Sequence, residues 1–370
     1  MKELEIRQCV IKVLTPLHVG CGEAYEPFSF FVDHAKKQLA VLNMDAFITA
    51  LNARLRNEFS TICQKGTTES LLDMYKFLRR VGEQKDIVEK QGVIARRIPV
   101  ASGFLEHYRE VVGGQPQSRP DPRRPMRRQQ TPLSQKIITQ FLIARTAFDV
   151  NGKGRPIIPG SSVKGAIRTA VLNLRRHIVR GRTYGPKENK ELERDILQGS
   201  FSTDPLSLLK VSDFVPVGEP KMKIVYAVNV KKTSGRQARG PYQILEVVME
   251  GEFSGSITLL KAEKDREVRS PLTFDEIAEA LQAFYSNELK REESEIQAAG
   301  FKVSLPRSAN IRIGRHSGAE CVTIEGFRRI KIMGGNPPQQ PHATTLWVAS
   351  EERRKPLGCL PFGWCELNMR

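Results

Sequence analysis

The sequence predicts an α+β fold, in which strands, hairpins and helices follow one another without the regular alternation of a doubly wound sheet. Residues 4–14 mix β-branched and polar side chains in the manner of a strand. The runs 28–33 and 39–42 flank a polar turn and predict a hairpin, and Asp45 precedes an amphipathic helical stripe. Strand, hairpin and helix in this order indicate a rearranged ferredoxin-like unit.

Composition restricts the class of protein and its partners. With 370 residues the chain is long enough for two domains, or for one domain with large insertions. A formal net charge of +17 indicates a polyanionic partner, for which nucleic acid is the leading candidate. No signal-like apolar core or run of roughly 18 apolar residues is present, so we expect a cytoplasmic protein with no membrane contact. Its six scattered cysteines indicate reduced thiols, and we expect neither a metal site nor a cofactor.

The first unit is expected to be interrupted by an insertion. We assign residues 1–59 and 133–215 to the first unit and residues 60–132, where apolar side chains recur at helical spacing, to the insertion. Its last part, 113–132, is rich in arginine and proline and is expected to be mobile. This loop could become ordered on RNA or on a neighbouring subunit, or it could be a solvated linker.

Residues 216–370 are expected to form a second, β-rich part. Strand-like runs lie between residues 222 and 260. Thr273 then precedes a helical stripe with a glutamate at capping-box spacing. This strand and helix pattern predicts a second βαβ-like set.

The stretch 158–168 is the strongest candidate for a binding site. Its glycine and serines, Gly160, Ser161 and Ser162, predict a turn and a helix cap. Gly165 follows, and Lys164 and Arg168 stand four residues apart on one helical face. A helix start with free N–H groups, hydroxyls and cations is suited to bind phosphate, although an ordinary capped surface helix has the same pattern. No acidic residue occurs in the cation-rich run that follows, which favours a surface facing phosphate.

A glycine-containing loop follows the first strand. It carries His18, Gly20 and Gly22. A histidine in such a loop can act as an acid or base, brace the backbone, or contact RNA. No second catalytic group is visible nearby, so we interpret the loop as a binding or bracing element.

Two further basic segments lie in the second half of the chain. The first, 220–240, contains cations and no acid, which indicates a basic hairpin; its candidate contacts are Lys231, Lys232, Arg236 and Arg239. The second, 311–320, is a glycine-rich loop in which backbone N–H groups could bind phosphate; its candidates are Arg312, Arg315 and His316. His316 and Glu320 also have the residue types of an acid–base pair, which only geometry could confirm.

Taken together, these motifs resemble the RAMP superfamily of CRISPR-associated proteins. The loop Thr15–Gly22, the stretch 158–168 and the C-terminal glycine-rich loop occur in the order that this superfamily shows. The loop with Thr344–Trp347 and Pro361–Trp364 is most similar to the family of fifth subunits of type III-A Csm complexes.

The resemblance implies a modified RRM-like core that binds CRISPR RNA at the guide 3′ side and contacts the last of the repeated backbone subunits. It also implies a part in guide maturation, with trimming by other nucleases. By position, Lys164 and Arg168 match the cations of the family's central helix. The sequence departs from the RRM pattern because no strand carries an aromatic pair flanked by basic residues, so recognition of the RNA backbone fits better than base stacking.

Catalysis is the alternative interpretation of the same residues. The aspartate that target-cleaving backbone subunits carry in an early glycine-serine loop is not seen, since Asp33 falls in the predicted hairpin. A metal-independent endoribonuclease that processes CRISPR RNA, using His18 or His316, stays as one competing hypothesis, and another type III RAMP subunit as a second. We therefore expect no catalytic residues and a non-enzymatic RNA-binding subunit.

Overall fold

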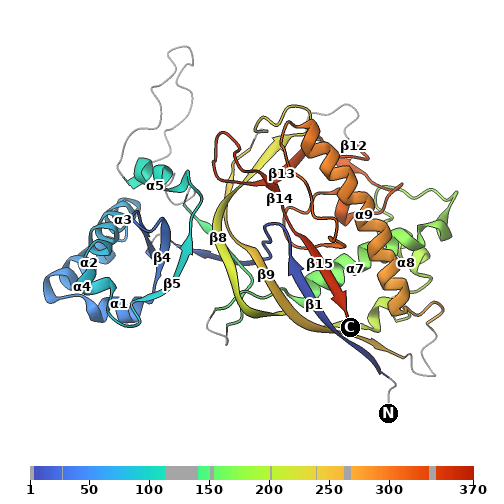
Figure 1. Cartoon of the computed structure of the whole chain (residues 1–370), viewed down its shortest axis with the longest axis horizontal. Helices are drawn as coiled ribbons and strands as arrows, with labels where there is room; N and C mark the ends of the chain where they lie inside the picture. The colour runs from blue at the N-terminus through green and yellow to red at the C-terminus, as the bar shows by residue number, and fades with distance from the viewer. Residues whose placement is uncertain are drawn as a thin grey trace.

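The structure is a computed structural model in which described residues are 4–26, 28–112, 141–150, 154–200, 202–238, 240–261, 268–332 and 339–370. The predicted arginine-proline loop at 113–132 lies outside these residues, and so does Arg239. Helices and strands are both abundant, which confirms the predicted α+β class (Figure 1).

A ten-stranded sheet forms the centre of the molecule. Its main path runs β10-β15-β1-β9-β8-β13-β14, with β2, β6 and β7 attached beside it. The strand bounds are β1 Leu4–Val13, β2 Gly20–Tyr25, β6 Ile143–Thr146, β7 Leu209–Val211, β8 Val215–Lys231, β9 Gln243–Leu260, β10 Ile311–Arg312, β13 Thr345–Ser350, β14 Leu360–Pro361 and β15 Trp364–Met369. Since β1 pairs with both β9 and β15, the two parts expected from the sequence share this one sheet.

Three helices pack against the sheet on the side of the molecule opposite the insertion (Figure 1). They are α7 (Gly160–Arg175), α8 (Asn189–Leu197) and α9 (Phe274–Ala298), accompanied by 3-10 turns η1 (Arg176–Val179), η2 (Pro205–Ser207) and η3 (Glu320–Val322). The stripe of α9 forms one core with buried residues of α7 and β1, as apolar periodicity requires. The Thr273 hydroxyl accepts the Glu276 N–H at 3.2 Å, which confirms Thr273 as the N-cap of α9, and the Glu276 carboxylate binds Arg175.

The insertion begins earlier than the sequence predicted. The predicted hairpin is β3 (Phe30–Asp33) and β4 (Gln38–Leu42), and it pairs with β5 (Ile94–Pro99) in a separate three-stranded sheet, apart from β1. The accompanying helices are α1 (Met44–Ala50), α2 (Ala53–Lys65), α3 (Thr68–Gly82), α4 (Lys85–Val88) and α5 (Phe104–Val112). The boundary at residue 59 is therefore misplaced, because the apolar faces of α1 and α2 are buried against α3 and α4.

One local detail corrects a further expectation. The first helix is capped by Asn43, whose side chain accepts the Ala46 N–H, and Asp45 lies in the first turn. A short ribbon, β11 (Ile330–Lys331) with β12 (Gln339–Gln340), completes the described strands. All six cysteines are free thiols, as predicted. Among the described residues, no helix is both long and apolar enough to cross a membrane.

Candidate nucleic-acid interface

Three segments that lie far apart in the sequence meet at one cleft of about 450 Å³. The first loop contributes Val19, the start and middle of α7 contribute Ser162, Gly165 and Thr169, and the glycine-rich loop contributes Gly314, Arg315 and Ser317. These are three of the four segments that the sequence indicated as candidate binding sites. The fold therefore places the first loop, the α7 motif and the glycine-rich loop around a common space.

The glycine-rich loop is held against the first loop by backbone contacts. The Arg315 N–H donates to the His18 carbonyl at 2.8 Å. Gly314 has a φ of 90°, and a Cβ there would lie 2.5 Å from the His18 carbonyl oxygen. Only glycine permits this approach. As a result, the Arg315 side chain is exposed at the rim of the cleft while its backbone is fixed.

His18 lies beneath the first loop and has no exposed surface. Its Nδ1 is 2.8 Å from the Glu246 carbonyl oxygen, so Nδ1 carries the proton and Nε2 has the free lone pair. Nε2 has no hydrogen-bond partner among the described residues. Burial lowers the pKa of the imidazole, which is therefore neutral. Gly20 and Gly22 are exposed on β2 above it, so these glycines present backbone to solvent and His18 braces the loop.

The N-cap of α7 differs from the predicted one. Pro159 is the N-cap, and no side chain makes a capping hydrogen bond, which corrects the role expected of Ser161 and Ser162. The Gly160 N–H instead donates to the Asp213 carboxylate at 2.8 Å. A Cβ on Gly160 would lie 2.3 Å from the Val211 carbonyl oxygen, so the glycine is needed for close packing. Ser161 is exposed and Ser162 lines the cleft.

Lys164 and Arg168 do not line the cleft, because at 100° per residue they lie on average roughly 110° around the axis of α7 from Ser162 and Gly165. The Lys164 ammonium donates to the Leu209 carbonyl at 2.8 Å, and burial lowers its pKa. Arg168 forms ion pairs with Glu193 and, at 3.5 Å, with Asp204. Both predicted phosphate contacts therefore have partners within the chain.

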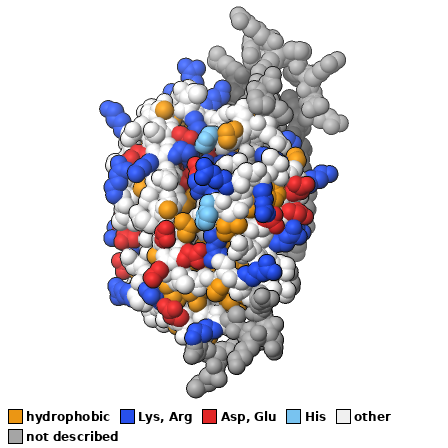
Figure 2. Space-filling model, turned by 90° about the vertical axis from the view of Figure 1, so that its right-hand side faces the viewer, with side chains coloured by type: hydrophobic (Ala, Val, Ile, Leu, Met, Phe, Trp, Pro, Cys, Tyr) orange, Lys and Arg blue, Asp and Glu red, His pale blue; other side chains and the backbone are white. Residues whose placement is uncertain are grey.

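The cations that follow along α7 and η1 are also neutralised, although the local sequence contains no acid. Arg175 is buried in a bidentate pair with Glu276 at 2.6 and 2.7 Å. Arg176 pairs with Glu325 at 2.8 Å. Figure 2 shows one whole face on which lysines and arginines are interspersed with acids. The sequence argument for an unbalanced basic helix is wrong, because acids come from distant segments.

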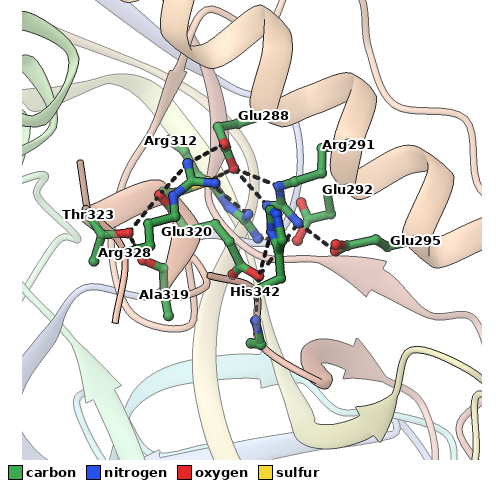
Figure 3. Close-up of polar contacts among 12 residues, drawn as sticks. Glu288, Arg291, Glu292, Glu295, Arg312, Ala319, Glu320, Thr323, Arg328 and His342 are labelled. Atoms are coloured by element: carbon green, nitrogen blue, oxygen red, sulfur yellow. Dashed lines mark hydrogen bonds and ion pairs between the residues drawn. The ribbon is translucent and has the colours of Figure 1, made fainter. Parts of the chain in front are cut away.

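Arg312 is the clearest correction among the predicted contacts. Its side chain is 1% exposed and its guanidinium pairs with Glu292 at 2.7 Å, beneath α9 (Figure 3). It also donates to the Phe362 carbonyl and lies over the Trp364 ring. Arg312 belongs to the wall of the cleft, but its guanidinium is enclosed and its charge is already neutralised by Glu292. Arg312 instead ties the glycine-rich loop to α9.

The basic hairpin is the turn between β8 and β9. Lys231 and Arg236 are exposed there, as a surface contact requires. Lys232 is not: its ammonium lies 2.8 Å from Glu295 and 2.9 Å from Glu320. Lys232 therefore joins the hairpin to α9 and to η3.

The carboxylates of Glu295 and Glu320 and the imidazole of His342 lie within 4.8 Å of one another, a grouping that could suit a cation. The Lys232 ammonium already lies between the two carboxylates. Although burial opposes it, the Lys232 charge and hydrogen bond lower the pKa of Glu320 to about 2. An ammonium thus fulfils the role that a metal ion would have here.

His316 and Glu320 do not form the acid–base pair that their spacing suggested. The His316 Nε2 is 3.3 Å from the Gln243 side-chain oxygen, and its ring stacks on Trp347 with centroids 4.4 Å apart. Burial lowers the pKa of His316 to about 3. Glu320 is instead bound by Lys232 and by the Ala343 N–H at 2.8 Å. The pair is absent because the loop turns the two side chains to different partners.

Sequence reasoning missed several residues of this region. Thr169 and Ser317 line the cleft, and Trp347 and Gln243 hold His316. A signal for Thr169 was present, since Ser162, Gly165 and Thr169 repeat at helical spacing as a stripe of small residues. Nothing in the sequence indicated Gln243, because only the folding of β9 into the sheet brings it next to His316.

The mixed sheet, the α7 helix and the glycine-rich loop together are features by which this chain can be compared with known protein families. The sequence pattern of the RAMP superfamily matches residues 10–320, and the chain belongs to this superfamily. A curated relative, "CRISPR system Cms protein Csm5" of Enterococcus italicus, is 22% identical over 230 residues, which are 62% of this chain and 53% of the relative. The chain thus spans about half the length of the curated relative that it matches.

Two solved structures share the fold. One is a chain of a Csm-crRNA-target RNA ternary complex of a type III-A CRISPR-Cas system, with a TM-score of 0.56, 18% identity and coverage of 98% of this chain and 100% of that chain. The other is the crystal structure of T. onnurineus Csm5, with a TM-score of 0.51, 19% identity and coverage of 85% and 92%. These likenesses agree with the α+β RAMP fold described above.

Proposed function

We propose that this chain is an RNA-binding subunit of a type III-A (Csm) interference complex. In this proposal it binds CRISPR RNA, caps the backbone of repeated RAMP subunits at the guide 3′ side, and supports guide maturation in antiviral defence. Membership of the RAMP superfamily and similarity to Csm5 support the assignment. One structurally similar chain belongs to a Csm-crRNA-target RNA ternary complex, which supports the choice of ligand.

The observation that carries the proposal is the convergence of the first loop, α7 and the glycine-rich loop at one cleft. Hydroxyl-bearing residues, exposed backbone and Arg315 line this cleft beside apolar residues such as Val19 and Val322, and the polar groups suit a ribose-phosphate chain better than base edges. Binding is therefore expected to depend strongly on salt and weakly on sequence.

Gly165 supports an external ligand at this place. It lies inside a helix and is exposed, and a Cβ there would meet nothing within 4 Å. A glycine inside a helix costs about 0.5–1 kcal/mol relative to alanine, and no contact of the described residues requires it. Close approach of an RNA backbone to the helix would explain why the position lacks a side chain.

The test is RNA binding by a Gly165→Leu variant. Leucine is a good helix former, so thermal stability should be equal or higher, while the side chain fills the cleft and weakens binding of labelled single-stranded RNA about tenfold or more. Gln282→Leu, at an exposed position of α9, is the matched control and should bind as the wild type does. Unchanged RNA affinity of the Gly165→Leu variant would contradict the proposal.

An endoribonuclease is the second hypothesis, favoured by the free lone pair of His18 Nε2. It requires movement, because His18 is buried and His316 is bound to Gln243. Incubation of the chain with labelled repeat RNA in EDTA tests it. Cleavage that disappears in His18→Ala or His316→Ala would replace the non-enzymatic assignment.

Recruitment of a trimming nuclease is a third role, proposed for the arginine-proline loop from its composition. Deletion of residues 114–131 should then leave complex assembly intact and abolish guide trimming. Normal guide length after the deletion would exclude this role.

A further inference from the structure

An aromatic pair that the sequence does not reveal lies beside the cleft. His316 from the glycine-rich loop stacks on Trp347 of β13, with an interplanar angle of 29° and centroids 4.4 Å apart. The other side of the imidazole meets Phe362 at 5.4 Å. Both His316 and Trp347 are partly exposed, so part of the stacked surface is open to solvent.

The position of His316 is fixed although its backbone is unfavourable. Its φ is 67°, a left-handed conformation that is uncommon outside glycine and is frequent at functional sites. The flanking residues hold it there: the Arg315 N–H donates to the His18 carbonyl, and the Ser317 hydroxyl donates to the Gly314 carbonyl at 2.7 Å. The loop therefore presents a fixed aromatic ring.

The residues around Trp347 are suited to a nucleotide. Trp347 pairs with Asn229 and Thr345 pairs with Lys231, so the exposed Lys231 lies diagonally beside Trp347 on the same face of the sheet. Exposed Arg315 directly precedes His316 in the chain and lines the cleft. Each member of the aromatic pair thus has a cation nearby, Lys231 beside Trp347 on the sheet and Arg315 next to His316 in the chain.

Gln243 completes this arrangement. Its side-chain oxygen accepts from His316 Nε2–H, which leaves the amide NH₂ as a donor next to the ring. A donor at the edge of an aromatic surface can meet acceptor atoms on a stacked base.

We propose that Trp347, supported by His316, is a stacking platform for one base of single-stranded RNA, with Lys231 and Arg315 beside the flanking phosphates. This inference rests on the proposed RNA-binding function and deepens it, because the cleft alone provides backbone contacts. Single-stranded RNA is the required form, since a base inside a duplex has no free face.

The chain has only two tryptophans, which permits a direct measurement. Trp364 is fully buried and its indole N–H donates to Glu292 at 2.6 Å, so it is shielded from ligand. Titration of the full chain with a uridine 12-mer should quench the fluorescence of Trp347. A ribose-phosphate 12-mer without bases should bind in the same salt-dependent way and cause no quenching.

Three variants separate stacking from packing. Trp347→Phe keeps an aromatic face and should bind the uridine 12-mer within about threefold of wild type while the quenching disappears. Trp347→Leu keeps apolar packing and should bind about 5- to 100-fold more weakly, the range expected when a stacked base loses its aromatic partner. Trp347→Ala, if it folds, should behave as the leucine variant does.

The outcomes distinguish this inference from the function on which it rests. Salt-dependent binding by the wild type without quenching, or wild-type affinity of the leucine variant, would overturn the platform and leave the cleft proposal standing. Absence of salt-dependent binding to either 12-mer would overturn both.

Discussion

Arg312 and Arg315 are three residues apart and have opposite environments. Arg312 is enclosed with Glu292, Cys321 and the Trp364 ring, whereas Arg315 is exposed at the rim of the cleft. Both were predicted to contact RNA, because a sequence shows the charge of a side chain and does not show its burial. The tight glycine-containing loop turns its side chains in different directions, and this decides which of the two arginines faces solvent.

Replacement of each arginine by alanine should therefore have different results. Arg312→Ala leaves the Glu292 carboxylate buried without its counter-charge and should lower the free energy of unfolding by about 3–5 kcal/mol. Arg315→Ala should change that free energy by less than about 0.5 kcal/mol and reduce the salt dependence of RNA binding by about one phosphate contact. Urea unfolding and binding at several salt concentrations measure both effects. Equal destabilisation by the two variants would contradict this assignment.

At the scale of the element, α7 has two functional faces. Ser162, Gly165 and Thr169 line the cleft, whereas Lys164 is bound to β7 and Arg168 to α8 and to Asp204, which precedes η2. From the sequence we predicted a helix at this place and expected its charged face, with Lys164 and Arg168, to bind phosphate. Helical spacing separates the two sets, but only the partners of Lys164 and Arg168 reveal that this face is turned to the protein.

Two glycines of α7 should respond oppositely to alanine. Gly160→Ala places a Cβ against the Val211 carbonyl and should destabilise the protein by roughly 1–3 kcal/mol. Gly165→Ala meets open space and should stabilise it by about 0.5–1 kcal/mol. Thermal unfolding of the two variants decides the matter, and a stabilised Gly160→Ala variant would show that α7 does not pack as described.

At the scale of the whole molecule, buried histidines couple stability to pH. Burial lowers the pKa of His107 and of His316 to about 3, from an ordinary value of 6.5. The unfolded chain therefore binds protons between pH 6.5 and 3 that the folded chain does not. Stability is complete above pH 6.5 and is lost as pH falls towards 3, by at most about 1.4 kcal/mol per pH unit for each histidine.

Urea unfolding at pH 7, 6, 5 and 4 measures this slope. His107→Gln and His316→Gln should each reduce this slope by the equivalent of about one bound proton. His177→Gln, at an exposed position, should retain the wild-type slope. A wild-type stability that rises on acidification would contradict the burial of these imidazoles. Glu320, whose pKa is about 2, adds a further loss below pH 4.5 in the same direction.

Much of the fold was predictable because it depends on local patterns. The α+β class, the capped start of α9 and the helix after residue 159 follow from periodicity and capping, which act over a few residues. The insertion boundary was not predictable, because β3 and β4 look alike whether they pair with β1 or with β5. Pairing partners are chosen by long-range contacts.

The amino-acid sequence by itself determined the three motifs of the candidate site and the charge that indicates a polyanionic ligand. Tertiary structure decided which residues of those motifs are open to solvent: Gly165 and Arg315 are exposed at the cleft, while Arg312 is buried in its wall. Arg312 and Arg168 are paired with acids from α9, α8 and the segment before η2. Tertiary structure also brought Trp347 onto His316. The physical reason is that burial and ion pairing depend on segments far apart in the chain, which a linear pattern does not encode.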